Sequence, residues 1–162
     1  MEIANIYNQK ENVDCLSCDL ISGKIPLPFG SILQDEHFDA HQDFEIPIPG
    51  FVIVVSKRHI ESIDEFTEEE KTDFINFMIK VRKAIRTVLN IEYVYLIQEE
   101  DTRHHFHFWL FPVTDDFLQK FGRGVKNVRP YMEYARANLK TDQNLKVIQE
   151  SADKMREYLT QK

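Results

Sequence analysis

Closely spaced histidines beside aromatic residues are the part of this sequence best suited to chemistry. The run from His104 to Pro112 is rich in aromatic residues and ends in proline, which is typical of a β-strand. Successive strand side chains point to opposite faces, so His105, His107 and Trp109 share one face, and its two imidazoles lie about 7 Å apart. Such a pair either holds a metal ion or includes at least one catalytic imidazole. His104 falls on the other face, where we expect a structural or exposed side chain.

The two cysteines, Cys15 and Cys18, form a CxxC motif whose role the residues alone leave open. A structural disulfide is rare in a reducing compartment. A redox-active CxxC of the thioredoxin type follows a strand, and no strand is predicted before Cys15. A metal knuckle needs two further ligands from elsewhere in the chain, and two unrelated thiols are the remaining alternative.

Composition limits the classes of protein to consider. The chain has 162 residues, of which 43% are hydrophobic and 29% charged, as expected for one globular domain. The net charge of −7 argues against a nucleic-acid partner, because phosphate contacts need clustered Lys and Arg. No apolar run has the length of a membrane span, and the first residues lack the pattern of a signal peptide. We therefore expect a cytoplasmic protein without a membrane partner.

The apolar pattern predicts the strands that position these side chains. They are expected at residues 31–33, 38–41, 51–55, 93–98 and 104–112. Residues 51–55 are continuously apolar and mostly β-branched, which indicates a strand buried on both faces. The short polar loop 99–103 predicts that the last two strands form an antiparallel hairpin.

The predicted helices have recognisable starts. They are expected at residues 18–22, about 68–90, 130–139 and 142–159. Thr67 and Glu70 form a capping box for the long helix, Pro130 suits a first helical position, and Thr141 caps the last helix. Residues 1–14 are polar and expected to be irregular. The order of strands, long helix, strands and then helices predicts an α+β domain.

Three segments resemble the histidine-triad (HIT) superfamily of nucleotidyl hydrolases and transferases, over roughly residues 15–112. CLSC at 15–18, followed by GKIP at 23–26, is similar to the family's CxxC and GxIP opening. Asp43 followed by PGFVIVVSKRH at 49–59 resembles its D and PGHxLVIPKxH segment, and HFHFWLFP at 105–112 resembles its HxHxHxxP signature. The resemblance implies a HIT-like antiparallel sheet with one long helix over residues 1–114. Residues 115–162 would add a C-terminal helical extension of the same domain, and a homodimer is expected.

The resemblance also implies roles for the histidines. His107 matches the family's middle histidine, which attacks the α-phosphate of a nucleotide and forms a covalent nucleotidyl-histidine. Imidazole suits this task, because it is largely neutral near pH 7 and a good leaving group when protonated. In the zinc-containing branch, which includes galactose-1-phosphate uridylyltransferases and many bacterial HIT proteins, two histidines join the CxxC pair. The matching set is Cys15, Cys18, His59 and His105, which implies a structural zinc in a tetrahedral Cys2His2 site.

Four further residues match substrate positions of the family. Asp43 matches the carboxylate that accepts the ribose hydroxyls, the alternative being a turn aspartate before Pro47. Gln98 stands where the family has Asn, and Thr102 where a hydroxyl can reach phosphate; plain loop polarity is the alternative for both. Trp109 replaces the third histidine, so it can donate one N–H, stack on a base or simply pack, but it cannot transfer a proton.

Other departures from the family pattern concern rate and substrate. Phe51 replaces a histidine, Ser56 replaces a proline, and the glycine-containing GxxxGQ segment is absent. The loop 122–124, with Lys126 and Arg129, is either a solvated loop or a phosphate contact across a dimer.

The sequence thus predicts a nucleotide hydrolase or nucleotidyl transferase acting through His107. Its expected substrates are dinucleoside polyphosphates or nucleoside phosphoramidates. One alternative is a catalytically weak nucleotide-binding regulatory module, which Trp109, Phe51 and the missing glycines favour. The other is a metal-dependent hydrolase in which His105 and His107 both bind a catalytic metal and the CxxC motif is unrelated.

Overall fold

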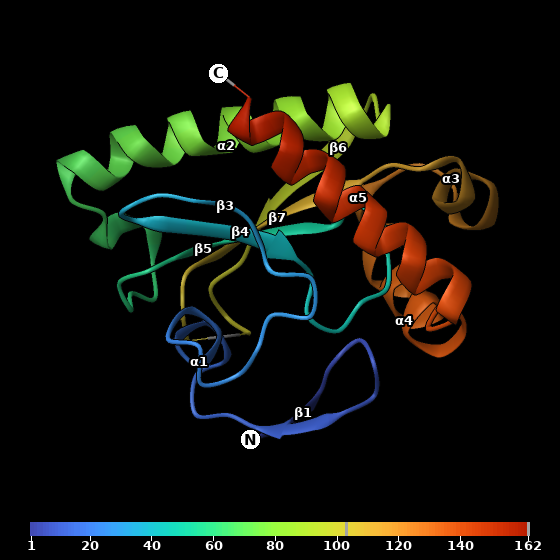
Figure 1. Ribbon diagram of the computed structural model, residues 1–162, viewed down its shortest axis with the longest axis horizontal. Coiled ribbons are helices and arrows are strands. Elements are labelled where there is room, and N and C mark those ends of the chain that lie inside the picture. Colours follow the sequence, from blue (N-terminus) through green and yellow to red (C-terminus); the bar gives the residue numbers. More distant parts are fainter. Residues whose placement is uncertain (103, 162) are drawn as a thin grey trace.

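A five-stranded antiparallel sheet forms the centre of the computed structural model, which describes residues 1–102 and 104–161 (Figure 1). Arg103, the end of the predicted loop, lies outside the described residues. The strand order is β3-β4-β5-β7-β6, and every neighbouring pair is antiparallel. The strands are β3 (Ser31–Gln34), β4 (Phe38–Gln42), β5 (Val52–Ser56), β6 (Val94–Gln98) and β7 (His107–Pro112). The predicted α+β class and the β6–β7 hairpin are confirmed.

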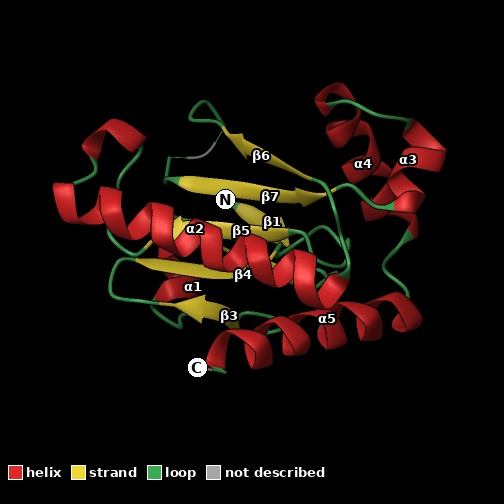
Figure 2. Ribbon diagram, turned by 90° about the horizontal axis from the view of Figure 1, so that it is seen from above, coloured by secondary structure: helices red, strands yellow, loops and turns green. Residues whose placement is uncertain are grey.

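Two helices cover one face of the sheet, α2 (Glu68–Leu89) and α5 (Asp142–Thr160) (Figure 2). The capping box of Thr67 and Glu70 starts α2, and Thr141 caps α5, as predicted. Their apolar sides enclose a core with the even-numbered residues of β7, including the fully buried Leu110. Burial of this apolar surface is the main force that holds the helices against the sheet.

The other face of the sheet carries α1 (Leu16–Ile21), on the side of the sheet away from α2 (Figure 1). A separate core on this face joins the odd-numbered residues of β7 to α3 (Asp115–Phe121) and α4 (Val128–Asn138). Two single turns of 3-10 helix, at Ile63–Glu65 and Val125–Asn127, lie in the connections. This face differs from the α2 face because its helices are short and leave part of the sheet uncovered, which creates room for a cavity.

The N-terminal segment is not irregular, contrary to the prediction. Residues 1–14 contain a hairpin of β1 (Glu2–Ala4) and β2 (Lys10–Asn12). The Asn5 side chain closes the turn, since its Oδ1 accepts hydrogen bonds from the backbone N–H groups of Tyr7 and Gln9 at 2.9 and 3.0 Å. The segment is tied to the domain through a backbone hydrogen bond from Ile6 to Phe44.

Several element boundaries also differ from those expected. Strand β7 begins at His107 and not at His104, because the backbone N–H of Phe106 bonds the carbonyl oxygen of Ile60, outside the regular ladder. Helix α4 begins two residues before Pro130. The proline therefore lies in the first turn, where backbone N–H groups have no partner within the helix and the lack of one costs no hydrogen bond. Helix α3, capped by the Thr114 hydroxyl, was not predicted. None of the helices in the described part of the chain combines the length and apolar character needed to cross a bilayer.

Candidate active site and metal centre

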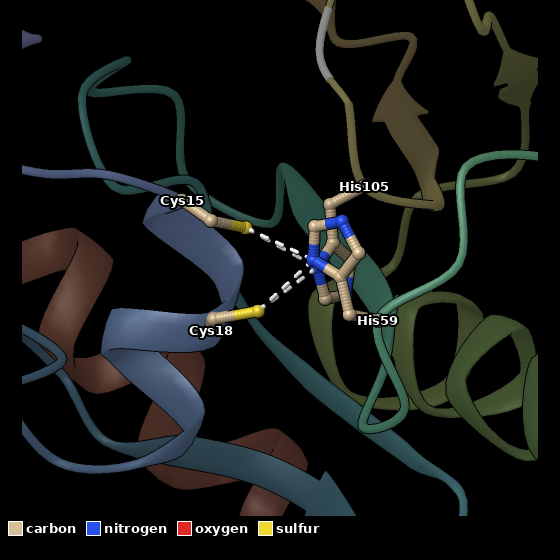
Figure 3. Close-up of side chains that lie close together, drawn as sticks. All are labelled: Cys15, Cys18, His59 and His105. Carbon is tan, nitrogen blue, oxygen red and sulfur yellow. Dashed lines mark hydrogen bonds between the residues drawn. The ribbon is translucent and has the colours of Figure 1, made fainter.

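Four potential metal ligands from three separate segments converge beneath the sheet (Figure 3). Cys15 occupies the N-cap position of α1, and Cys18 lies one turn later on the same side of that helix. His59 follows the end of β5, and His105 precedes β7. Their ligand atoms all lie within 4.8 Å of one another.

The spacing of these atoms fits a single tetrahedral ion. The Cys15 Sγ lies 3.6 and 3.3 Å from the Nδ1 atoms of His59 and His105, and the Cys18 Sγ lies 3.2 and 3.4 Å from them. The two Nδ1 atoms are 3.2 Å apart. Zinc bonds of about 2.0 Å to nitrogen and 2.3 Å to sulfur would place the ligands roughly 3.3–3.8 Å apart. The donor set and its spacing therefore suit zinc.

The protonation of His105 also fits a ligand role. Its Nε2 lies 2.7 Å from the carbonyl oxygen of Ser56, which can only accept, so Nε2 carries the proton and Nδ1 offers its lone pair. Burial lowers the pKa of His105, against the effect of that hydrogen bond, so the ring is neutral at pH 7. Burial and the neighbouring Cys15 raise the pKa of Cys18 to about 11 when no cation balances the two thiols. A bound metal ion reverses this preference by stabilising the thiolates.

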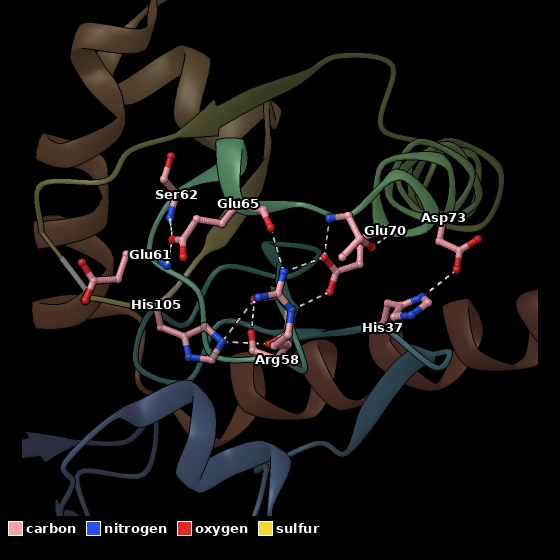
Figure 4. Close-up of polar contacts among 10 residues, drawn as sticks. His37, Arg58, Glu61, Ser62, Glu65, Glu70, Asp73 and His105 are labelled. Carbon is pink, nitrogen blue, oxygen red and sulfur yellow. Dashed lines mark hydrogen bonds and ion pairs between the residues drawn. The ribbon is translucent and has the colours of Figure 1, made fainter.

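An ion pair anchors the segment that carries His59 (Figure 4). Arg58 donates from Nε and Nη2 to the two carboxylate oxygens of Glu70 at 3.0 and 2.8 Å, and Nη2 also reaches the carbonyl oxygen of Glu65 at 2.8 Å. Glu70 is the third residue of α2 and is itself buried. The metal-binding segment is thus fixed to the start of the longest helix.

His107 lies on the wall of a cavity of about 510 Å³, on the face of the sheet opposite α2. Its Nδ1 is 2.9 Å from the carbonyl oxygen of His105, so Nδ1 donates and the Nε2 lone pair is left for chemistry. The ring is only 8% exposed, which limits its motion. Among the described residues, the groups of side chains able to share a metal ion do not include His107. The geometry therefore separates the two histidines, and it does not support the alternative in which both bind one catalytic metal.

Asp43 lies on the wall of the same cavity. Its Oδ1 accepts hydrogen bonds from the backbone N–H groups of Glu45 and Ile46 at 2.9 and 2.6 Å. Burial raises the pKa of Asp43, although those two hydrogen bonds oppose the effect. The residue therefore stabilises a turn and also presents a carboxylate to the cavity, so the two interpretations of the sequence are compatible.

The structure places Thr102 and Gln98 differently. Thr102 lines the cavity, and its hydroxyl donates to Glu99 Oε1 at 2.8 Å. Gln98 pairs with Phe108 across the hairpin, and Phe108 packs on Phe74 of α2. Cross-strand partners share a face, so Gln98 belongs to the face opposite the cavity, and the described cavity wall does not include it.

Trp109 both packs and lines the cavity. Its side chain is 9% exposed, and its ring meets the edge of Phe51 at 5.7 Å between centroids and lies 6.3 Å from that of His107. Phe51 is fully buried and contacts Phe111 as well, so this departure from the family pattern is a core residue.

Helix α4 contributes Arg129, Met132 and Arg136 to the cavity wall, a spacing that places all three on one side of the helix. The sequence named Arg129 only as a possible phosphate contact beside the loop 122–124, and Arg136 was not predicted. Arg129 bonds Glu99 at 2.6 Å, and Arg136 bonds Glu45 at 2.8 Å. This spacing is visible in the sequence, but only the fold shows that this side of α4 faces His107.

His41 also lines the cavity and belongs to a buried acid–base pair. The Nδ1 of His41 lies 2.9 Å from Asp39 Oδ1, both on β4, and the hydroxyl of Ser31 on β3 donates to the same carboxylate. Both members of the pair are buried, so each compensates the other for the loss of water.

Comparisons with known proteins all lead to one family. The family model described as the HIT domain matches residues 28–155. The protein hit of Bacillus subtilis is 34% identical over 73 residues, 45% of this chain and 49% of that protein. An uncharacterized HIT-like protein of Methanocaldococcus jannaschii is 32% identical over 123 residues, 70% of this chain and 91% of that protein.

Two further comparisons concern chemistry and fold. A galactose-1-phosphate uridylyltransferase of Thermotoga maritima is 31% identical over 84 residues, which are 48% of this chain and 26% of that enzyme. The crystal structure of a zinc-bound histidine triad family protein from Mycobacterium smegmatis superposes with a TM-score of 0.64 at 19% identity, covering 91% of this chain and 94% of that one.

Proposed function

The chain belongs to the HIT domain family, and from that premise we propose that it is a nucleotide hydrolase or nucleotidyl transferase. His107 is the proposed nucleophile, and the cavity beside it is the proposed nucleotide site. The observation that carries the proposal is the hydrogen bond from His107 Nδ1 to the carbonyl oxygen of His105 at 2.9 Å. It leaves Nε2 with a lone pair at the wall of a cavity of about 510 Å³, a volume that suits a nucleotide.

The proposed reaction has two steps. His107 Nε2 attacks the α-phosphorus, the N–P bond forms, and the bond to the leaving group breaks with its electron pair on that group. Water or another acceptor then attacks the same phosphorus and displaces the imidazole. In the intermediate the ring is positively charged, and the His105 carbonyl stabilises that charge through the Nδ1 proton.

The proposed zinc has a structural role. Cys15, Cys18, His59 and His105 would hold it, and the zinc-bound relative from Mycobacterium smegmatis supports this choice of metal. A bound zinc supplies a cross-link between α1, the segment after β5 and the start of β7. The chain's own contribution is to position the His105 carbonyl that orients His107.

The remaining substrate contacts follow from the cavity wall. We assign the ribose hydroxyls to Asp43 and a phosphate contact to Thr102, since both lie on that wall. We assign no substrate contact to Gln98, because it lies on the face of the sheet opposite the cavity. The substrate class covers nucleotides with a leaving group on the α-phosphate, such as dinucleoside polyphosphates.

We also propose that the chain forms a homodimer in the cytoplasm and that residues 115–162 extend the same domain. The edge strand β6 exposes Leu96, and α2 exposes Ile75 and Ile79, which supports an interface there. The packing of α5 on the α2 face supports one domain.

Trapping the covalent intermediate tests the proposed function. Zinc-loaded protein is mixed with radiolabelled diadenosine tetraphosphate and quenched in base, and the adduct is located by mass spectrometry. We expect one nucleotide on His107, none in His107→Ala, and the wild-type amount in His37→Ala, because His37 is not part of the described cavity wall. Equal turnover in wild type and His107→Ala across a broad substrate panel would refute the proposal.

A nucleotide-binding module without turnover is the second candidate. The packing of Trp109 at the position of the third histidine favours it, because an indole carries no transferable proton at pH 7. Tight mononucleotide binding without product formation would identify this function.

A further inference from the structure

The residue that follows His107 on the same face of β7 cannot assist a leaving group by itself. Trp109 lies beside His107, with 6.3 Å between ring centroids. An indole has one N–H donor and no charge. A nucleotidyl transfer at His107 therefore needs another group to stabilise the charge of the departing fragment.

Helix α4 places the cationic side chain of Arg129 beside Trp109, on the wall of the same cavity. The guanidinium carbon of Arg129 lies 5.6 Å from the centre of the Trp109 ring, within cation–π range. Its Nη2 donates to Glu99 Oε2 at 2.6 Å. Arg129 and Glu99 both line the cavity that contains His107. The Arg129 side chain keeps 60% of its surface exposed, so it remains accessible to a ligand.

Glu99 is a second charged group on the cavity wall, in direct contact with Arg129. Burial alone would raise the pKa of Glu99, but hydrogen bonds from Thr102 and Arg129 and the charge of Arg129 lower it. Glu99 is therefore a carboxylate at neutral pH, on the cavity wall that also includes His107. An anionic substrate would be repelled by that carboxylate unless Arg129 offsets it.

The donors of Arg129 exceed what one carboxylate can use. A guanidinium has five N–H groups in a planar fork that matches a phosphate, and the Glu99 contact engages Nη2. Glu99 and Trp109 thus hold the guanidinium in place from two sides. A phosphate entering the cavity next to His107 finds a preformed partner.

We infer that Arg129, held by Trp109 and Glu99, binds the phosphate adjacent to the α-phosphate and stabilises it as it leaves. This inference rests on the proposed function and specifies its substrate class. As the His107 N–P bond forms, the bridging P–O bond breaks, and its electron pair stays on the leaving phosphate. Arg129 neutralises that charge, and no proton is required, because a phosphate departs as an anion.

The inference carries a specificity. An amine leaving group needs a proton as it departs, and arginine cannot supply one because its guanidinium does not lose a proton in proteins. The site therefore suits nucleoside diphosphates, triphosphates and dinucleoside polyphosphates better than phosphoramidates with an uncharged amine.

Ligand binding tests the subsite without turnover. In zinc-loaded protein carrying His107→Asn, the affinities for ADP and AMP, and for UDP and UMP, are measured by calorimetry. We expect the diphosphates to bind about 10-fold or more tightly than the monophosphates. Adding Arg129→Gln should remove that preference and leave monophosphate affinity within about threefold, whereas Arg129→Lys should retain part of it.

The matched control is Arg123→Gln, since Arg123 stacks on Tyr93 and is not part of the described cavity wall. It should keep the full preference. Equal binding of mono- and diphosphates before Arg129 is changed, no diphosphate binding at all, or an unchanged preference in Arg129→Gln would each overturn the subsite.

Turnover separates this inference from the proposed function. In protein that retains His107, Arg129→Gln should lower kcat/KM for diadenosine tetraphosphate about 100-fold. The same change should lower kcat/KM for adenosine 5′-phosphoramidate by less than about threefold. Equal losses on both substrates would contradict the inference while leaving His107 as the nucleophile. Absence of any adduct at His107, with the diphosphate preference intact, would refute the proposed function and retain the subsite.

Discussion

The Nδ1 atom of His107 lies 2.9 Å from the carbonyl oxygen of His105, a residue whose own ring joins the cysteine cluster. The backbone group that fixes the tautomer of one histidine thus belongs to a ligand of the metal centre. His105 in turn donates from Nε2 to Ser56 at 2.7 Å, so its ring is held at both ends. This chain of contacts links the metal centre to the candidate nucleophile without requiring the metal to touch the substrate.

Loss of a metal ligand should therefore act on stability first. We expect His59→Ala to lose most of its bound zinc and to unfold at a lower temperature, because the cluster joins three segments. Metal analysis by mass spectrometry and thermal unfolding measure both effects. His104→Ala, with an exposed side chain outside the cluster, is the control and should keep its zinc. Full zinc content in His59→Ala would contradict the assignment.

Chelation distinguishes a structural from a catalytic zinc. A structural zinc predicts that adduct formation at His107 declines only as the protein loses structure, since His107 lies outside the cluster. Circular dichroism and adduct yield are followed together after a chelator is added. Immediate loss of activity with the fold intact would instead indicate a catalytic metal.

The Arg58–Glu70 pair should make stability depend on acid pH. Two hydrogen bonds from Arg58 outweigh burial and lower the pKa of Glu70 from 4.5 to about 2. A lowered folded-state pKa gives stability that is present above pH 4.5 and is lost as the pH falls toward 2. The Arg58 side chain is half-exposed, so solvent screens part of the interaction. Glu70→Gln should therefore reduce the free energy of unfolding at pH 7 by about 2 kcal/mol.

Urea unfolding at several pH values measures this effect. The difference between wild type and Glu70→Gln should shrink below pH 4.5. The neighbouring Glu69 is exposed, so Glu69→Gln should change stability by less than about 0.5 kcal/mol. A pH-independent loss in Glu70→Gln would show that the effect is not electrostatic.

Restoring the family histidine at position 51 should harm the protein. Phe51 is fully buried against Trp109 and Phe111, so Phe51→His places a polar ring where water cannot reach it. We expect a loss of about 2–4 kcal/mol in the free energy of unfolding. Phe51→Leu keeps the site apolar and should lose less. A gain in turnover at unchanged stability would mean that position 51 belongs to the active site.

The proposed ribose contact of Asp43 can be tested by changing the sugar. Asp43→Asn should weaken binding of a ribonucleotide about 10-fold and that of its 2′,3′-dideoxy analogue much less, because only the former offers hydroxyl donors. Gln98→Ala is the control, since Gln98 lies on the opposite face, and it should bind both as wild type does. If Asp43→Asn weakened binding of both nucleotides equally, Asp43 would only stabilise the turn at Glu45 and Ile46 and would not contact the ribose.

Helix α5 should be indispensable to the core. Ile148 is fully buried in the core on the α2 face, so Ile148→Ala should cost about 2–5 kcal/mol in the free energy of unfolding. Val147, its neighbour, is exposed, and Val147→Ala should cost less than about 1 kcal/mol. A single denaturation transition in both variants would support one domain, and two transitions would indicate that α5 belongs to a separate unit.

Local patterns were enough to predict the central elements. The apolar run at residues 51–55 and the capping box at Thr67 led to β5 and α2 within a residue or two. The resemblance to the HIT family also led to the four residues that the fold brings within 4.8 Å of one another. These features succeed because each depends on short segments with strong propensities or fixed motif spacing.

What the sequence could not give depends on contacts between distant segments. The strands of the N-terminal hairpin are short and largely polar, so their sequence has no pattern that predicts a strand. The hairpin is tied to the domain by the hydrogen bond from Ile6 to Phe44, which joins segments far apart in the sequence. The approach of Arg129 to Trp109 joins α4 to β7 and has no local pattern. Phe51 lies beside a strand buried on both sides, so alternation of polarity could not show which side it faces.

The alternation of side chains along β7 has a consequence for mutational tolerance. Odd positions such as His107 and Trp109 face the cavity, and even positions such as Phe108 and Leu110 face the core under α2. Deleting or inserting one residue within this strand would exchange the two sets, sending the imidazole toward the hydrophobic core and leucine toward the cavity. The length of β7 is therefore constrained more strictly than the identity of many of its residues, and a single change of length would disturb both the cavity and the core.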